Sequence, residues 1–229
     1  MNSSALVTAV IPSYNHAKYI KESIQSMLDQ DYENMEMIII DDGSSDNSIE
    51  IIESMIPLCK KRFKRFEFRH RENKGLCTTL NEAIIWAKGK YLSILASDDI
   101  ALSHKISFLI EKIENSNYPA VFGDIKRIGE RNDKEPNIKE FTIHTFDEIF
   151  TLQNRPFAPS SIYRIEALKK IGGYPVDIAV EDWYMELKFT ENNNKIVSYP
   201  EVLTYYRRHE KNTSKNYELI YNNFIKIVD

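Results

Sequence analysis

The chain has 229 residues and a formal net charge of -4, with 42% hydrophobic and 28% charged residues. This composition is typical of a folded globular protein and argues against disorder, and its acidic balance does not favour general nucleic-acid binding, which needs a basic face. Two cysteines, Cys59 and Cys77, are too few for a disulfide framework or a zinc site.

The first half of the chain alternates short apolar runs with helical patterns. Strands are predicted over residues 6–11, 35–40, 66–69 and 91–95, and apolar residues at helical spacing mark helices at 20–28, 51–56, 76–87 and 106–113. Strict alternation of this kind predicts βαβ units. We therefore expect an α/β fold with three layers, in which helices cover both faces of a mainly parallel central sheet.

The second half has a weaker pattern, which begins after about Val121. The polar stretch 130–139 indicates a loop or hairpin. Helical pieces are expected at 146–152, 165–171 and 181–190, short strands at 196–199 and 202–206, and an outer helix at 215–228. With no repeat or linker, we expect a single domain over 1–229, with a ligand-binding half at 1–100, a catalytic half at 101–214 and a helical tail at 215–229.

Ligands of parallel sheets bind beyond the carboxyl ends of the strands. Three polar segments follow predicted strands and should meet at this edge: Pro12-Ser13-Tyr14-Asn15, Asp41-Asp42-Gly43-Ser44-Ser45-Asp46 and Ser97-Asp98-Asp99. Adjacent carboxylates at a strand end suit Mn²⁺ or Mg²⁺ that bridges to phosphate oxygens. The alternative for Asp98 and Asp99 is a cap on the helix that begins near Leu102.

A turn followed by a helix cap accounts for Gly43 and Asp46 in the second segment. It leaves unexplained why Asp41 and Asp42 stand beside another acidic pair, since clustered negative charge is unfavourable without compensation. A metal ion or a hydrogen-bond donor of a ligand would supply that compensation.

Several of these segments, taken in order, resemble the family 2 glycosyltransferases, which have the GT-A fold. The resemblance spans nearly the whole chain and is carried by Val10-Ile11-Pro12-Ser13-Tyr14-Asn15, Ile40-Asp41-Asp42-Gly43-Ser44-Ser45-Asp46, Asn73-Lys74-Gly75, Ala96-Ser97-Asp98-Asp99, Glu181-Asp182 and Tyr206-Arg207-Arg208-His209. Each motif is modest alone, and the ordered set is specific.

The resemblance implies a nucleotide site formed by Pro12, Tyr14, Asp41, Asp42, Asn73 and Asp98. Tyr14 would pack on the base and ribose, and Asp42 would accept a hydrogen bond from the base. The resemblance also implies Asp99 as the main ligand of a Mn²⁺ or Mg²⁺ ion, with Ser97 where the family motif often has its first acid. His209 would be a second metal ligand or a donor to phosphate.

On the acceptor side, the resemblance implies that Asp182 is the general base of an inverting reaction and that Glu181 orients the acceptor or the base. The alternative is that both acids only complement the dipole of the helix that they open. Trp183 would stack on a sugar or belong to the core. Arg207 would counter the diphosphate or end a strand in solvent. The remaining histidines are expected in surface or loop positions: His16, His70, His104 and His144.

The implied activity is transfer of a sugar from a nucleoside diphosphate, UDP before GDP or dTDP, to a saccharide or lipid-linked saccharide. Bacterial surface glycan biosynthesis is an association of the family. The competing hypotheses are a catalytically inactive binding module of the same fold and a phosphoacceptor signalling domain, which would leave Glu181, Asp182 and His209 without a role.

The N-terminus lacks the basic region and long apolar core of a signal peptide. The apolar run at 37–40 is far too short to cross a bilayer. We therefore expect a cytoplasmic protein, and peripheral association with the inner face of the membrane stays open.

Overall fold

The computed structural model describes residues 4–129, 138–210 and 212–228. Its described strands are β1 (Val7–Ser13), β2 (Met35–Asp41), β3 (Phe66–His70), β4 (Tyr91–Ile94), β5 (Ile100–Ala101), β6 (Ala120–Gly129), β7 (Thr142–His144), β8 (Ser161–Arg164) and β9 (Ile196–Arg208). They form a nine-stranded sheet in the order β3-β2-β1-β4-β8-β6-β9-β5, with β7 paired to β9.

The N-terminal part of the sheet is parallel, because helices cross over between its strands. β1 pairs in parallel with β2 and β4, and β2 pairs in parallel with β3. The register aligns Ser13 with Asp41 at the carboxyl ends of β1 and β2. The polar segments that follow these strands therefore start from the same edge, and the predicted α/β fold class is confirmed.

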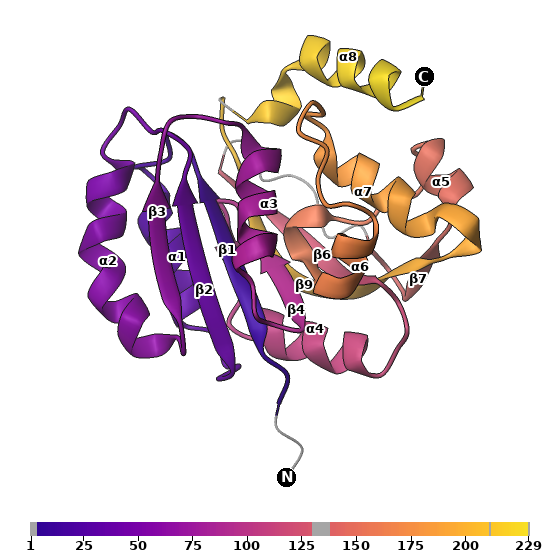
Figure 1. Cartoon of the computed structure of the whole chain (residues 1–229). Coiled ribbons are helices and arrows are strands. Elements are labelled where there is room, and N and C mark those ends of the chain that lie inside the picture. Colours follow the sequence, from indigo (N-terminus) through magenta and orange to yellow (C-terminus); the bar gives the residue numbers. More distant parts are fainter. Residues whose placement is uncertain (1–3, 130–137, 211, 229) are drawn as a thin grey trace.

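Two helix layers cover the sheet (Figure 1). Helices α1 (Ile20–Leu28), α2 (Ser48–Arg62) and α4 (Lys105–Glu114) pack on one face, and α3 (Leu76–Trp86), α6 (Ile165–Lys170) and α7 (Glu181–Thr190) pack on the other. Side chains alternate between the two cores along each strand: Ala9 and Ile11 face the first, and Val10 faces the second.

The C-terminal half differs from the sequence prediction in its strands. The two short strands expected near 196 and 202 are one strand, β9, which pairs in parallel with β6. The interruption at Tyr199-Pro200-Glu201 is absorbed by a bulge, since Phe122 pairs with Ser198 but Asp124 pairs with Val202. The expected loop at 130–139 lies mostly outside the described residues.

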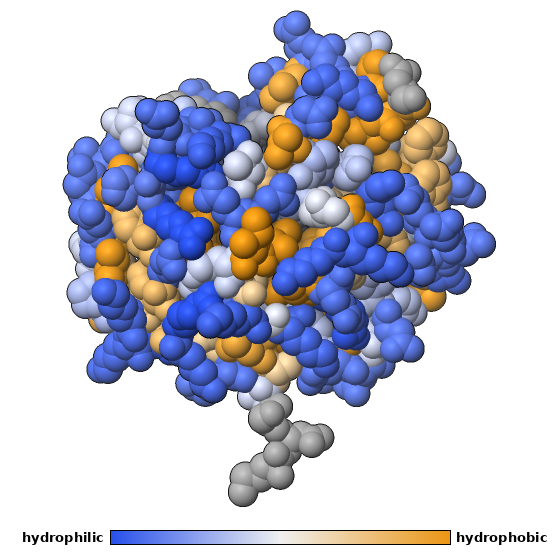
Figure 2. Space-filling view, viewed as in Figure 1, coloured by the Kyte–Doolittle hydropathy of each residue, from blue (hydrophilic) through white to orange (hydrophobic). Residues whose placement is uncertain are grey.

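The smaller described elements are α5 (Phe146–Phe150), the 3-10 turns Ala158–Ser160, Glu191–Asn193 and Thr213–Lys215, and α8 (Tyr217–Val228). The expected tail helix therefore begins at Tyr217, after the 3-10 turn. α8 packs on α7, with the rings of Phe224 and Trp183 4.4 Å apart. Figure 2 shows hydrophobic residues around α8 and, in the middle of the same face, around α3, between hydrophilic stretches. Phe150 of α5 and Ile225 of α8 are exposed. None of the described helices combines the length and the apolar character that crossing a membrane requires.

Candidate functional site

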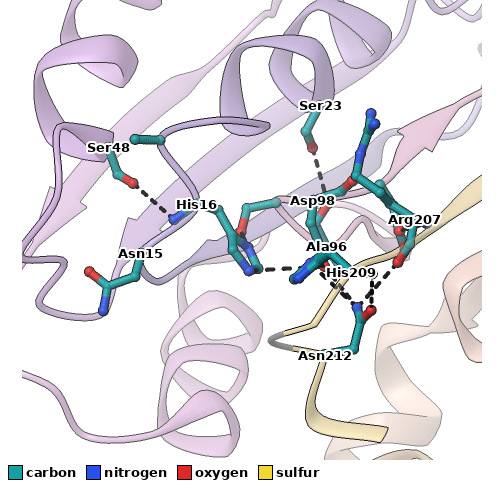
Figure 3. A network of polar contacts seen from close by, with 12 residues as sticks. Asn15, His16, Ser23, Ser48, Ala96, Asp98, Arg207, His209 and Asn212 are labelled. Atoms are coloured by element: carbon teal, nitrogen blue, oxygen red, sulfur yellow. Dashed lines mark hydrogen bonds and ion pairs between the residues drawn. The ribbon is translucent and has the colours of Figure 1, made fainter. Parts of the chain in front are cut away.

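Two histidines from opposite ends of the chain meet Asp98 just beyond the carboxyl end of β4. His209 Nε2 lies 2.9 Å from Asp98 Oδ2, and His16 Nε2 lies 3.9 Å from the same oxygen. Among the described residues, these three form a group whose ligand atoms all lie within 4.8 Å of one another. Figure 3 shows His16 in the loop after β1 and His209 after the end of β9, both beside Asp98. Two imidazole nitrogens and a carboxylate oxygen at this spacing can hold a divalent cation.

Neighbouring side chains orient this group, which we call the His16–Asp98–His209 cluster. His16 Nδ1 lies 2.7 Å from Ser97 Oγ, so the second ring nitrogen is engaged as in many metal-ligating histidines. The Asn212 side chain donates to Asp98 Oδ2 at 3.4 Å and accepts from the backbone N–H of His209 at 2.6 Å. The Tyr19 ring stacks on His209 at 5.1 Å.

Asp99, the expected metal ligand, is buried directly beside the cluster. Its Oδ1 accepts a hydrogen bond from the Arg207 backbone N–H at 2.8 Å, whereas its Oδ2 is buried with no hydrogen-bond partner. Burial and the adjacent Asp98 charge raise the pKa of Asp99. Behind it, burial lowers the pKa of Lys105 to about 7, and Asp99 works in the opposite direction. A bound cation would satisfy this buried Asp99 oxygen.

Helix capping does not explain Asp98 and Asp99. Helix α4 begins at Lys105 after the cap residue His104, so neither acid lies at its N-terminus. The carbonyl of Asp98 instead accepts from Arg207 Nε at 2.8 Å, and the Arg207 guanidinium also pairs with Glu22. Arg207, expected to counter a diphosphate, thus anchors the segment that carries the two acids.

Asp41 and Asp42 organise the loops at the ends of β2 and β3. Buried Asp41 accepts hydrogen bonds from the Ser13 hydroxyl at 2.9 Å and from the Ser44 N–H at 2.8 Å. Asp42 accepts from the backbone N–H groups of Lys74 and Gly75, each at 2.9 Å, and pairs with Arg71. The Asp42 carboxylate therefore shapes the segment that contains Asn73.

The other expected nucleotide residues border the same loops. Tyr14 is 49% exposed, and Pro12 is partly buried opposite Ile40. Asn73 is exposed and accepts from the Gly75 N–H at 3.2 Å. Gly43 has φ +83°, and a Cβ there would lie 2.8 Å from the Asn73 nitrogen, so only glycine lets the two loops approach so closely.

The pair Glu181-Asp182 opens helix α7, which leaves the dipole explanation valid beside a catalytic one. The Asp182 side chain is 40% exposed, and its Oδ2 lies 3.3 Å from Arg155 Nη2. Burial and the neighbouring Asp182 raise the pKa of Glu181. The partly exposed Asp182 therefore lies next to Glu181, whose surroundings favour its neutral form.

Trp183 belongs to the core, which was one of the two expectations for it. Its ring is 2% exposed, and its Nε1–H donates to the Ile149 carbonyl at 2.9 Å. The ring lies between Phe150 and Phe224. Its position on α7 points it away from the solvent face of Asp182, so it has no free surface for a sugar.

The start of α3 contacts both the loop after β2 and the segment that precedes α7. Asp42 accepts from the Gly75 N–H just before α3, and Cys77 in the first turn of α3 donates its thiol to the Ile178 carbonyl at 3.2 Å. Ile178 lies four residues before Asp182. Both acidic segments are therefore connected to the same end of α3.

Surface hollows do not by themselves mark this region. One is lined by residues of 145–147 and 190–195, none of which is an expected site residue. A second is lined by residues of 138–144 and 153–157 and reaches Arg155, the partner of Asp182. The site is thus recognised from its polar chemistry rather than from a deep cavity.

Sequence reasoning missed several residues that contact the expected site: His16, Tyr19, Lys105, Arg155, Glu186 and Asn212. His16 was expected in a loop or at the surface, and it is half-buried in a loop beside Asp98. Its place five residues after Ile11, the predicted end of the first strand, was the one signal available.

Comparisons with known proteins agree with this arrangement. The model of the family described as "Glycosyl transferase family 2" matches residues 8–172. The glycosyltransferase GlyG of Streptococcus pneumoniae is 37% identical over 122 residues, which cover 53% of this chain and 39% of that protein. The Escherichia coli protein named UDP-Glc:alpha-D-GlcNAc-diphosphoundecaprenol beta-1,3-glucosyltransferase WfgD is 28% identical over 82% of this chain and 71% of its own length.

Solved structures share the fold. S. aureus TarS 1-349 in complex with UDP-GlcNAc has a TM-score of 0.74 at 23% identity, over 90% of this chain and 59% of that chain. The mannosyltransferase PcManGT from Pyrobaculum calidifontis, in complex with GDP-Man and Mn²⁺, has a TM-score of 0.76 at 15% identity over 99% of this chain and 64% of that one. Since the matched family segment covers most of a GT-A-type sheet with its acidic edge, this chain belongs to glycosyl transferase family 2.

Proposed function

We propose that this glycosyltransferase is an inverting, metal-dependent enzyme that transfers a hexosyl or N-acetylhexosaminyl group from a UDP-sugar to a saccharide or lipid-linked saccharide. The His16–Asp98–His209 cluster beside the acidic pair is the observation that carries the proposal. The printed names of relatives support the donor and acceptor classes, because TarS binds UDP-GlcNAc and WfgD is named for a diphosphoundecaprenol-linked acceptor. Surface glycan biosynthesis at the inner face of the membrane would fit such an acceptor.

The donor atoms suit a cation. His16, His209 and Asp98 supply two nitrogens and an oxygen. Asp99, the ligand expected from the sequence, lies outside this group, and its buried Oδ2 without a hydrogen-bond partner is the next oxygen along the chain. Imidazole ligands favour Mn²⁺ over Mg²⁺, which prefers oxygen and water. When bound, the cation would offset the charge that develops on the departing diphosphate.

The nucleotide would lie over the loops after β1, β2 and β3. Exposed Tyr14 would offer a ring face to the base, and partly buried Pro12 would line the same pocket. Asp42, supported by Asp41, would accept from the base while it holds the Asn73–Gly75 segment in place. Asp98 would lie between the ribose of the nucleotide and a cation held by the His16–Asp98–His209 cluster.

Asp182 would act as the general base. Its partly exposed carboxylate can reach an acceptor hydroxyl, and an inverting reaction needs one base opposite the leaving group. Glu181, which its surroundings favour in the protonated form, would donate a hydrogen bond to the acceptor. Arg207 contributes by holding the Asp98-Asp99 segment.

The test separates this enzyme from an inactive binding module of the same fold. UDP with Mn²⁺ should raise the melting temperature of both, since a ligand that binds only the folded state stabilises it by mass action. Only the enzyme should release UDP from a UDP-sugar, and Asp182→Asn should lower that rate by about 10²-fold or more while the UDP-dependent stabilisation remains. Asp177→Asn, which changes an exposed acid nearby, is the matched control. A wild-type protein that binds UDP and turns over no donor would favour the binding module.

A further inference from the structure

We propose that Arg155 is a positioning residue that aims the Asp182 carboxylate at the acceptor, and that Glu186 in turn holds Arg155. The inference rests on the proposed role of Asp182 as the base. It adds two residues that none of the sequence motifs contains.

The Arg155 guanidinium bridges two turns of helix α7. Its Nε donates to Glu186 Oε2 at 2.7 Å, and its Nη2 lies 3.3 Å from Asp182 Oδ2. Asp182 and Glu186 are four residues apart and share one helix face. The other oxygen of Asp182 accepts from the Trp183 N–H at 2.7 Å, so both oxygens of the base have defined contacts.

The loop that carries Arg155 is fixed on both sides. The Asn154 carbonyl lies 3.2 Å from His144 Nδ1, and the Pro159 carbonyl accepts from Lys105 Nζ at 2.8 Å and from the Thr204 hydroxyl at 2.9 Å. The backbone on both sides of Arg155 is therefore anchored to β7, β9 and α4, whereas its side chain contacts α7. Such preorganisation limits the positions that the Asp182 carboxylate can take.

Three carboxyl groups interact with the Arg155 guanidinium: Glu181, Asp182 and Glu186. The other titratable groups that interact with these acids are Tyr163 of β8, Tyr174 before α7 and Cys77 of α3.

Burial raises the pKa of Glu186 to about 8, with Arg155 acting against that shift, and Glu181 shifts in the same direction. Two of the three acids are thus favoured in the neutral form near pH 7. Arg155 contacts both Asp182 and Glu186, and Asp182 is the more exposed of these two acids, so it is the one that an acceptor can reach.

The test follows release of UDP from a panel of UDP-glucose, UDP-GlcNAc, UDP-galactose and GDP-mannose (GDP release) with Mn²⁺, using the donor that turns over fastest. In this hydrolysis a water oxygen bonds to the anomeric carbon, the nucleoside diphosphate leaves with the electron pair, and Asp182 takes the water proton. The variants are Arg155→Met, Arg155→Lys and Glu186→Gln, with Arg164→Met as control. Arg164 is another partly buried arginine, but it donates to the carbonyls of Tyr118, Ile113 and Ser116 and forms no ion pair with an acid in the described part of the chain.

Removing a cation beside a carboxylate disfavours its charged form, so Arg155→Met should move the acidic limb of the kcat/KM profile up by about one pH unit and lower kcat about tenfold at pH 7. Arg155→Lys should keep the limb in place, and Glu186→Gln should too, because a neutral amide oxygen accepts the same bond. Arg164→Met should lower the melting temperature without moving the limb. If Arg155→Met fails to fold, Arg155→Gln, which keeps a donor for Glu186, should show the same shift.

The outcomes separate the two levels of the proposal. An unmoved limb in folded Arg155→Met or Arg155→Gln, together with an inactive Asp182→Asn, overturns the positioning role and leaves the base intact. Full turnover in Asp182→Asn, or no turnover of any donor by the wild type, overturns the proposed function itself.

Discussion

His209 Nε2 and Asp98 Oδ2 lie 2.9 Å apart although 111 positions separate the two residues in the sequence. The sheet register produces this contact. β9 runs antiparallel to β5, with Ile100 opposite Tyr205 and Ala101 opposite Thr204, so the residues just before β5 face those just after β9. The pairing of the short strand β5 with β9 therefore places His209 beside the acidic pair.

The first prediction concerns the metal. Replacing His209 or His16 by alanine should each weaken Mn²⁺ binding by at least about tenfold, because each change removes one nitrogen ligand. Titration followed by electron paramagnetic resonance of free Mn²⁺ measures this directly, without turnover. His104→Ala is the control, since His104 contacts Glu201 and not Asp98. Equal Mn²⁺ affinity in His16→Ala and the wild type would show that His16 is not a metal ligand.

The second prediction concerns Asp42. Asp42→Ala removes an acceptor shared by Arg71 and by the N–H groups of Lys74 and Gly75, so the Asn73–Gly75 segment should loosen. We expect a loss of about 2–3 kcal/mol in the free energy of unfolding and weaker UDP binding. Chemical denaturation and calorimetric titration with UDP report the two effects. Glu53→Ala, at an exposed position of α2, should change neither.

The third prediction concerns the pH dependence of stability. The pKa of Glu186 is about 8 in the folded chain against 4.5 without the protein environment, so between these values the folded state binds more protons than the unfolded state. The contribution of this group to stability is therefore lost as pH rises from about 4.5 to about 8. Glu186→Gln cannot ionise and should flatten the decline by at least about 1 kcal/mol, measured by denaturation at pH 5 and pH 8. An unchanged slope would show that Glu186 ionises in the folded chain as it does in the unfolded one.

The fourth prediction concerns the contact between α8 and α7. Phe224→Ala should cost about 2 kcal/mol, at the low end for a phenylalanine because the ring is only half-buried. The fluorescence of Trp183, whose ring lies 4.4 Å from that of Phe224, should shift to the red as water reaches it. Ile225→Ala on the exposed side of the same helix should stay within about 0.5 kcal/mol of the wild type.

The sequence alone determined the first half of the fold and the acidic residues of the site. Apart from the short strand β5, the strands and helices up to Glu114 have strong local periodicity, and parallel topology requires polar residues after β1, β2 and β4 to share an edge. Asp41, Asp42, Asp98 and Asp99 could therefore be expected together before any coordinates were known.

Only the tertiary structure decided which groups those acids meet. β5, β7 and β8 were not expected from the sequence. β5 is two residues long, too short for periodicity to reveal, yet its pairing with β9 sets where Arg207 and His209 lie. Long-range packing likewise brings His16 to Asp98, Lys105 behind Asp99 and Arg155 to Asp182. Which residues form a ligand set or a charge pair depends on distances between segments that are far apart in the sequence. Local sequence patterns do not specify those distances, because the packing of the folded chain sets them.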